Sequence, residues 1–289
     1  MTEFRPGRFQ ILPTIVKNLI IINAIMVFAH FVLGKFGIDL ADHLGLHYWK
    51  SEYFMPWQFL THMFMHGGIA HIFFNMFALW MFGSVLENVW GPKRFLTFYL
   101  ISGLGAAVLH LAVVAYGFYG IEQAFSAYQA NPTVESMRAF IDEYVTRPTG
   151  NTLINEVINT YNYWAAHPGT DMSQESITAI NRYIHGYTYP PTGQYFSGIF
   201  DEATVGASGA VFGILFAFGY LFPNTLLYIY FLVPIKAKYV VGGLALIELF
   251  SGFRNSAGDN VAHFAHLGGM LVGFILLKIW NKRNRSQFY

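Results

Sequence analysis

The stretch VGASGAVFGILFAFGYLF, residues 205–222, is almost wholly apolar, and its polar side chains are Ser208 and Tyr220. Its length is close to the ~20 apolar residues that an α-helix needs to cross a bilayer. Ser208 lies near the start, after Gly206-Ala207 and before Gly209. Serine and glycine are common where membrane helices pack closely, so the quartet alone indicates a packing surface. A chemical role for Ser208 requires partners elsewhere in the chain.

The composition of the whole chain is that of a membrane protein. Of its 289 residues, 54% are hydrophobic and 11% are charged, with a mean hydropathy of +0.39, whereas typical soluble domains have about 25% charged residues. A net charge of +1, spread along the chain, excludes the basic surface that nucleic-acid binding needs. The chain has no cysteine, which excludes disulfides, thiolate metal sites and a cysteine nucleophile.

Several apolar segments have about the length of a membrane helix. They are residues 18–34, 69–87, 95–117, 205–222, 238–252 and 261–280. The expected fold class is all-α, a polytopic bundle of six transmembrane helices. Leu226–Ile235 is apolar but too short to span, so we expect it at the interface or against the bundle. The first segment lacks a small-residue cleavage site, so we expect it to be a retained span. A chain of bare spans without a targeting segment favours a bacterial inner (plasma) membrane.

Basic residues set the expected orientation of these helices. With the N-terminus inside, eleven of the 17 Lys and Arg residues lie on the inner side, which predicts an N-in, C-in arrangement. The expected parts are a cytoplasmic segment 1–17, helices 1–3 with an outer loop at 18–116, an extracytoplasmic insert at 117–204, helices 4–6 at 205–280 and a cytoplasmic tail 281–289.

The insert is the largest segment expected outside the membrane. It holds nine acidic and three basic residues. Apolar residues recur at helical spacing in 133–145 and 151–164, which predicts short helices packed over the bundle. The sequence leaves open whether the insert is a lid, a docking element or a structural cap.

Polar residues fall at a similar depth in three of the predicted helices, within roughly 10 Å of the outer boundary. They are His71, Asn75, Ser208 and His266. A serine hydroxyl needs an adjacent base to become a nucleophile, and an imidazole can take its proton, so Ser208 and His266 are the candidate pair. Asp259 lies in the loop before His266, and Glu248 lies on helix 5 with its facing unknown. We therefore expect a Ser-His dyad without a carboxylate.

His71 and Asn75 are four residues apart and project from one face of their helix. Their side chains can donate hydrogen bonds to a developing oxyanion, which contributes about 3 kcal/mol in known enzymes. The alternative is a polar contact between helices, worth about 0.6 to 2 kcal/mol.

Glycines supply a packing constraint on the same two helices. They form small-xxx-small pairs, Gly209 with Gly213 on helix 4 and Gly269 with Gly273 on helix 6. Such pairs let helix backbones approach closely. Docking the two glycine faces would bring His266 toward Ser208.

Four motifs, in this order along the helices, resemble those of the rhomboid family of intramembrane serine proteases. The motifs are His71-Ile72-Phe73-Phe74-Asn75 (HxxxN), Gly83-Ser84-Val85-Leu86-Glu87-Asn88-Val89-Trp90-Gly91 (GxxxExxxG), Gly206-Ala207-Ser208-Gly209 (GxSG) and Ala265-His266-Leu267-Gly268-Gly269 through Gly273 (AHxxGxxxG). The resemblance covers nearly the whole chain outside the insert.

By that resemblance, the chain would be a serine endopeptidase that cleaves single-span membrane proteins near the extracytoplasmic end of the substrate helix. Ser208 would be the nucleophile and His266 the base. His71, Asn75 and the Ser208 backbone amide would form the oxyanion site, and Gly206 would admit the substrate backbone. The partners would be transmembrane protein substrates and membrane lipid, and no metal or other cofactor is implied.

The sequence departs from the family pattern at three places. Phe212 would stack on His266 where many members have a tyrosine, which keeps the ring. Trp57-Gln58 replaces a frequent Trp-Arg pair and leaves the anchoring of the first outer loop open. The family gives no general role for the long insert.

Rival functions have weaker support. His62 and His66 have the spacing of zinc ligands, but Met63 occupies the general-base position of an HExxH site. We expect His62, His66 and His263 at the outer rim or in the polar network around the site. A catalytically inactive rhomboid-like protein that binds membrane helices would be expected to lack Ser208 or His266. No inverted repeat favours a transporter, and the oligomeric state stays open.

Overall fold

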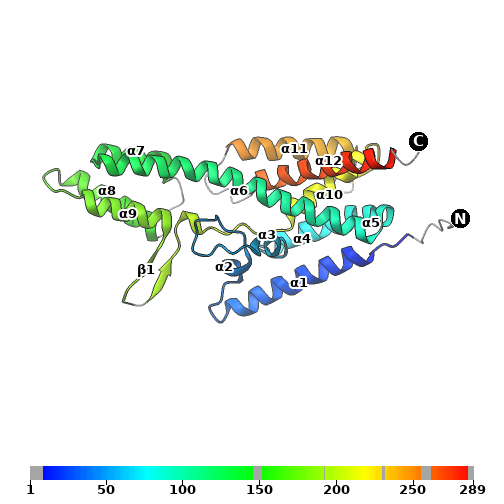
Figure 1. The fold of residues 1–289 in the computed structure, drawn as a ribbon, viewed down its shortest axis with the longest axis horizontal. Helices are drawn as coiled ribbons and strands as arrows, with labels where there is room; N and C mark the ends of the chain where they lie inside the picture. Colours follow the sequence, from blue (N-terminus) through cyan, green and yellow to red (C-terminus); the bar gives the residue numbers. More distant parts are fainter. Residues whose placement is uncertain (1–8, 146–151, 192, 230–231, 255–261, 286–289) are drawn as a thin grey trace.

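The computed structural model describes residues 9–145, 152–191, 193–229, 232–254 and 262–285, which fold mostly into helices (Figure 1). Among these residues, four helices are long and apolar enough to cross a membrane. They are α1 (Thr14–Gly34), the helix Ile69–Trp90, α6 (Pro92–Ala130) and the part His263–Trp280 of α12 (His263–Arg285). The chain is an integral membrane protein.

The fourth and fifth predicted spans are helices, but they differ from the other four. α10 (Ser208–Leu221) has 14 residues, about 21 Å of helix, which is shorter than the ~30 Å hydrocarbon core. α11 (Ala237–Arg254) carries three charged residues, Lys238, Glu248 and Arg254. Length and composition therefore give four candidate spans in the described chain, and the count of six stays a prediction.

The second predicted span is continuous but changes its helical geometry midway. It consists of α4 (Ile69–Ala78), the π-helical turn η2 (Leu79–Gly83) and α5 (Ser84–Trp90). It ends at Gly91, whose φ of +77° favours glycine, and Pro92 then occupies the first turn of α6.

The Glu87 of the GxxxExxxG pattern has a structural counterpart at the start of α1. The buried Glu87 carboxylate accepts hydrogen bonds from the backbone amides of Ile15 and Val16, each at 2.9 Å. These amides belong to the first turn of α1, which has no partner for them within the helix. The negative charge also stabilises the positive end of the helix dipole. Glu87 therefore joins α1 to α5.

The first outer loop contains α2 (Leu40–Leu44), α3 (Gln58–Thr61) and η1 (His62–Phe64). The fully buried Gln58 holds this loop: its Nε2 donates to the Tyr53 carbonyl at 2.7 Å, and its Oε1 accepts from the Met55 amide at 3.1 Å. The same Oε1 also accepts a hydrogen bond from the His47 amide at 3.3 Å. The departure from Trp-Arg at Trp57-Gln58 thus leaves the loop fastened by the glutamine itself.

The insert is built on an extension of α6, which continues to Ala130 rather than ending near residue 117. The short helices expected at 133–145 and 151–164 are present as α7 and α8, whereas the elements that follow them were not expected. In order, the insert contains α7 (Val134–Tyr144), α8 (Thr152–Ala166), α9 (Ser173–His185), the antiparallel pair β1 (Tyr187–Tyr189) and β2 (Gln194–Phe196), and η3 (Ile199–Asp201).

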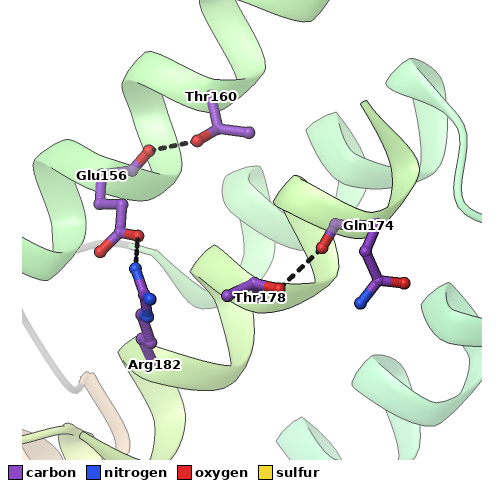
Figure 2. Close-up of polar contacts among 5 residues, drawn as sticks. All are labelled: Glu156, Thr160, Gln174, Thr178 and Arg182. Atoms are coloured by element: carbon purple, nitrogen blue, oxygen red, sulfur yellow. Dashed lines mark hydrogen bonds and ion pairs between the residues drawn. The ribbon is translucent and has the colours of Figure 1, made fainter. Parts of the chain in front are cut away.

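The insert has its own hydrophobic core. Phe125 and Tyr128 of α6 pack there with Trp164 of α8 and Ile180 of α9. Figure 2 shows the polar contacts outside this core, where Arg182 of α9 pairs with Glu156 of α8 at 2.6 Å. Thr160 and Thr178 each donate to a carbonyl one turn earlier, on Glu156 and Gln174, so these hydroxyls are satisfied within their own helices.

The insert is attached to the first outer loop as well as to α6. Tyr48 of the loop packs in the insert core, and Ser51 donates to the Asp201 carboxylate at 2.7 Å. Lys50 pairs with Glu122 of α6 at 2.7 Å. In Figure 1 the insert helices lie at one end of the molecule, while the start of α1 and the end of α12 lie at the other.

The apolar segment before α11 is a hairpin. β3 (Leu226–Ile229) pairs antiparallel with β4 (Val233–Lys236), and α11 follows directly at Ala237. Leu226 and Tyr228 are exposed. Its expected place at the membrane interface stays a prediction.

Candidate active site

The glycine faces of α10 and α12 meet, as expected from their spacing. A Cβ on Gly269 would lie 1.8 Å from the Gly209 carbonyl oxygen, and one on Gly213 would lie 3.0 Å from the Gly269 carbonyl oxygen. One turn further, Gly273 would meet the Gly213 carbonyl oxygen at 3.3 Å. The two backbones are thus in direct contact, and only glycine fits at Gly269.

Ser208 is the first residue of α10, three residues later than the predicted start of the helix. The preceding residues cannot be helical because their backbones are bonded to the first outer loop. Thr204 exchanges two hydrogen bonds with Leu46, at 2.8 and 2.9 Å, and the Gly206 amide donates to the His62 carbonyl at 2.9 Å. Because the first amides of a helix lack intrahelical partners, the Ser208 amide is free of the α10 ladder.

Ser208 and His71 flank the same point beside Gly206. A Cβ on Gly206 would lie 3.4 Å from Ser208 Oγ and 2.9 Å from His71 Nε2, and the Gly206 φ of +134° also favours glycine. His71 Nδ1 accepts a hydrogen bond from the Gly67 amide at 3.4 Å. In the neutral ring the proton is then on Nε2, which makes His71 a hydrogen-bond donor toward this point.

Asn75 lies one turn after His71 on α4 and is 6% exposed. Its amide nitrogen is buried and has no hydrogen-bond partner in the described part of the chain. A buried donor without a partner is rare and costs about 1 to 3 kcal/mol, so it calls for an explanation. A group that receives this hydrogen bond only during a reaction provides one.

The His266 imidazole is held on two sides. The Phe212 ring stacks on it with a centroid distance of 4.1 Å and an angle of 6° between the planes, as the resemblance implied. Glu248 of α11 contacts it at its edge, with Oε2 2.9 Å from His266 Nδ1. Within the described residues no hydrogen bond joins Ser208 to His266, and such bonds are often long before substrate is bound.

Glu248 is the residue that sequence reasoning missed. The sequence left its facing open and favoured a dyad, whereas the structure places its carboxylate against both His263 and His266, with Oε2 2.6 Å from His263 Nδ1. A signal was present, because an acidic residue inside an apolar membrane helix is costly and almost always has a partner.

His62 and His66 are buried in the polar network rather than exposed at the rim. His62 is 6% exposed, with Nδ1 donating to the Gln58 carbonyl at 2.8 Å, and His66 is 5% exposed, edge-on to the His71 ring at 5.0 Å. Burial lowers the pKa of each to about 4. Both rings are therefore neutral at physiological pH.

The described residues contain one group that could hold a metal ion: Glu248, His263 and His266, whose ligand atoms lie within 4.8 Å of one another. His62 and His66 belong to no such group there, so the zinc alternative gains no third ligand. Asp259 lies outside the described residues.

Comparison with known proteins identifies the family. A family model described as the Rhomboid domain matches residues 53–144 and 157–283. The Rhomboid protease GluP of Bacillus subtilis is 37% identical over 68 residues, which are 24% of this chain and 13% of that protein. The Inactive RHOMBOID-like protein 8 of Arabidopsis thaliana is 34% identical over 65 residues, which are 22% of this chain and 18% of that protein.

A longer match is to an uncharacterized mitochondrial rhomboid protein of Schizosaccharomyces pombe. It is 23% identical over 303 residues, which cover 96% of this chain and 69% of that protein. Its mitochondrial name conflicts with the expectation of a bacterial inner membrane. Because the family model covers most of the sequence, including all four motifs, this chain belongs to the rhomboid family.

Proposed function

We propose that the chain is an intramembrane serine endopeptidase that cleaves single-span membrane proteins near the extracytoplasmic end of the substrate helix. The observation that carries the proposal is the convergence at Gly206, where one point lies 3.4 Å from Ser208 Oγ and 2.9 Å from His71 Nε2. A hydroxyl, a ring donor and a helix amide around one point are what acyl transfer requires. The relatives named as proteases add support, although the matched segments cover only small parts of them.

The proposed reaction begins with proton transfer from Ser208 Oγ to His266 Nε2 as Oγ bonds to the scissile carbonyl carbon. The carbonyl oxygen becomes an oxyanion, which accepts hydrogen bonds from the Ser208 amide, His71 and Asn75. As the C–N bond breaks, His266 returns the proton to the leaving amine, which leaves an acyl-enzyme on Ser208. Water then attacks this ester with His266 again as base. His266 passes the proton to Ser208 Oγ as the ester bond breaks, which restores the serine and releases the carboxylic acid product.

The proposed site lies at the N-terminal end of α10, and the hydrolysis step needs water to reach it from the outer side. A six-span arrangement with both termini inside is supported by the basic residues and by the common end at which α1 starts and α12 ends (Figure 1). A helical peptide bond is shielded and hydrogen-bonded. Substrates with small or helix-breaking residues at the cleavage site are therefore expected to be preferred.

The proposal is tested by reconstituting the protein in proteoliposomes with a model single-span substrate. Wild type should cleave the substrate and react covalently with a fluorophosphonate probe, and Ser208→Ala and His266→Ala should do neither. Cleavage by either variant at the wild-type rate would contradict the proposal. Binding of the substrate helix without cleavage or labelling would instead indicate an inactive helix-binding protein, the state named for one Arabidopsis relative.

A further inference from the structure

We infer that Glu248 is a positioning residue for His266, so that the site works as a Ser-His-Glu arrangement rather than as a dyad. This inference rests on the proposed function. Glu248 would act through the imidazole and would not touch the substrate.

The contact between Glu248 and His266 is short and buried. Glu248 Oε2 lies 2.9 Å from His266 Nδ1, and the two residues are each 8% exposed. The same oxygen lies 2.6 Å from Nδ1 of His263, one turn earlier on α12. A carboxylate that accepts two ring N–H bonds in a sheltered site is held in one orientation, and charge-assisted bonds of this kind are about twice as strong as neutral ones.

The carboxylate sets the tautomer of His266. An ionised carboxylate only accepts hydrogen bonds, so Nδ1 of the neutral ring carries the proton and Nε2 keeps its lone pair. Nε2 is then the atom that can take the Ser208 proton. When it does, the positive charge on the ring is stabilised by Glu248, which itself remains ionised.

Two contacts together fix the orientation of the His266 ring. Phe212 stacks on its face at 4.1 Å, which sets the plane, and Glu248 bonds to its edge, which sets the rotation within that plane. Neither contact alone does both. Because Glu248 lies on α11, this helix contributes to the site even though none of the family motifs falls on it.

The effect on pH dependence has to be separated from that of neighbouring ionisable groups. The titratable side chains that face His266 are Glu248 on α11, His263 on α12, His71 on α4 and His110 on α6. Among these, Glu248 supplies the negative charge.

The test compares Glu248→Gln, Glu248→Asp and wild type by the rate at which a fluorophosphonate labels Ser208, measured between pH 5 and 9. The Gln amide can donate to Nδ1 and so favours the unproductive tautomer, and the rate should fall by about 100-fold or more. Removing the charge should also move the acid limb of the profile to lower pH. Glu248→Asp, which keeps the charge, should retain more of the rate and a limb close to that of wild type.

A merely structural role would lower the rate without moving the acid limb, and that result would overturn the inference. So would wild-type labelling by Glu248→Gln. Thermal unfolding of each variant checks that it is folded. Labelling that requires added Zn²⁺ and is abolished by a chelator would also overturn the inference, because the three groups would then be metal ligands.

A measurement that does not depend on activity separates this inference from the proposed function. In His263→Ala protein with ¹⁵N-labelled histidine, the Nδ1 proton of His266 should give a downfield NMR resonance that disappears in His263→Ala/Glu248→Gln. If this resonance is present but wild type is not labelled, the proposed function fails while the contact stands. If it persists without Glu248, the positioning role is wrong.

Discussion

Gly206 lets the backbone pass close to Ser208 and His71 because it lacks a β-carbon. An added Cβ would lie 2.9 Å from both Cε1 and Nε2 of His71. In the proposed reaction, this atom would occupy the point where the substrate carbonyl sits. The proposed chemistry therefore needs a glycine at residue 206, and the φ of +134° there favours one as well.

Gly206→Ala should lower the labelling of Ser208 by at least about tenfold, since a misplacement of about 1 Å can cost about 100-fold. Gly37→Ala is the matched control, because Gly37 also has a positive φ (+78°) but no atom within 4 Å of its Cβ position. Gly37→Ala should strain the backbone at residue 37 without lowering the labelling of Ser208. Equal labelling by the two variants would mean that the space at residue 206 is not used.

The buried imidazoles of His62 and His66 make stability depend on pH. Burial lowers the pKa of each to about 4, while the unfolded value is 6.5. Below pH 6.5 the unfolded chain therefore binds more protons than the folded one, and stability falls as pH decreases toward 4. At pH 5 the loss should be about 2 kcal/mol for each histidine.

This loss is measured by thermal unfolding in detergent at pH 7.5 and pH 5. The difference between the two pH values should shrink in His62→Gln and His66→Gln, whatever each substitution does to stability at pH 7.5. An unchanged difference in both variants would show that these rings are protonated in the folded protein.

At the scale of the elements, the contact between α10 and α12 depends on single glycines. Gly269→Ala should destabilise the protein by about 3 kcal/mol, since its Cβ would overlap the Gly209 carbonyl oxygen. Gly243→Ala, on α11 with nothing within 4 Å of its Cβ position, should stay within about 1 kcal/mol of wild type. Unfolding in mixed micelles measures both. Similar values for the two would mean that the helices do not meet at Gly269.

The attachment of α1 gives a second prediction at this scale. Glu87→Gln removes the charge that two amides of α1 share at 2.9 Å and should cost about 2 kcal/mol. Glu122→Gln breaks the ion pair with Lys50, whose side chain is 48% exposed, and should cost less than about 1 kcal/mol. The same unfolding assay compares them, and a larger loss for Glu122→Gln would contradict this account.

The sequence predicted those elements whose signal is local. Apolar runs indicated α1, α6 and α12, and the glycine spacing indicated the contact between α10 and α12. Prediction from the sequence failed where a residue far along the chain determines the local structure. α10 begins at Ser208 because the backbone at Thr204 and Gly206 is bonded to the first outer loop, and no local pattern encodes that. The facing of Glu248 depends on the rotation of α11, which a nearly uniform apolar helix does not specify.

At the scale of the whole molecule, the absence of native cysteine makes the orientation testable. Lys17→Cys, Lys93→Cys and Gln174→Cys each create a single thiol at an exposed position. In right-side-out vesicles an impermeant maleimide should label the thiol at residue 174 alone, and in inside-out vesicles the other two. Labelling of residues 93 and 174 from one side would mean that α6 does not cross the membrane.

α6 is about 58 Å long, nearly twice the thickness of a hydrocarbon core. Ala106, near its middle, lies against Gly209, the residue after Ser208, and Phe125 and Tyr128, near its far end, lie in the core of the insert. One uninterrupted helix therefore connects the core of the insert to the residue beside the proposed nucleophile. A partner that displaced the insert core would therefore act, through α6, on the packing of α10 beside Ser208.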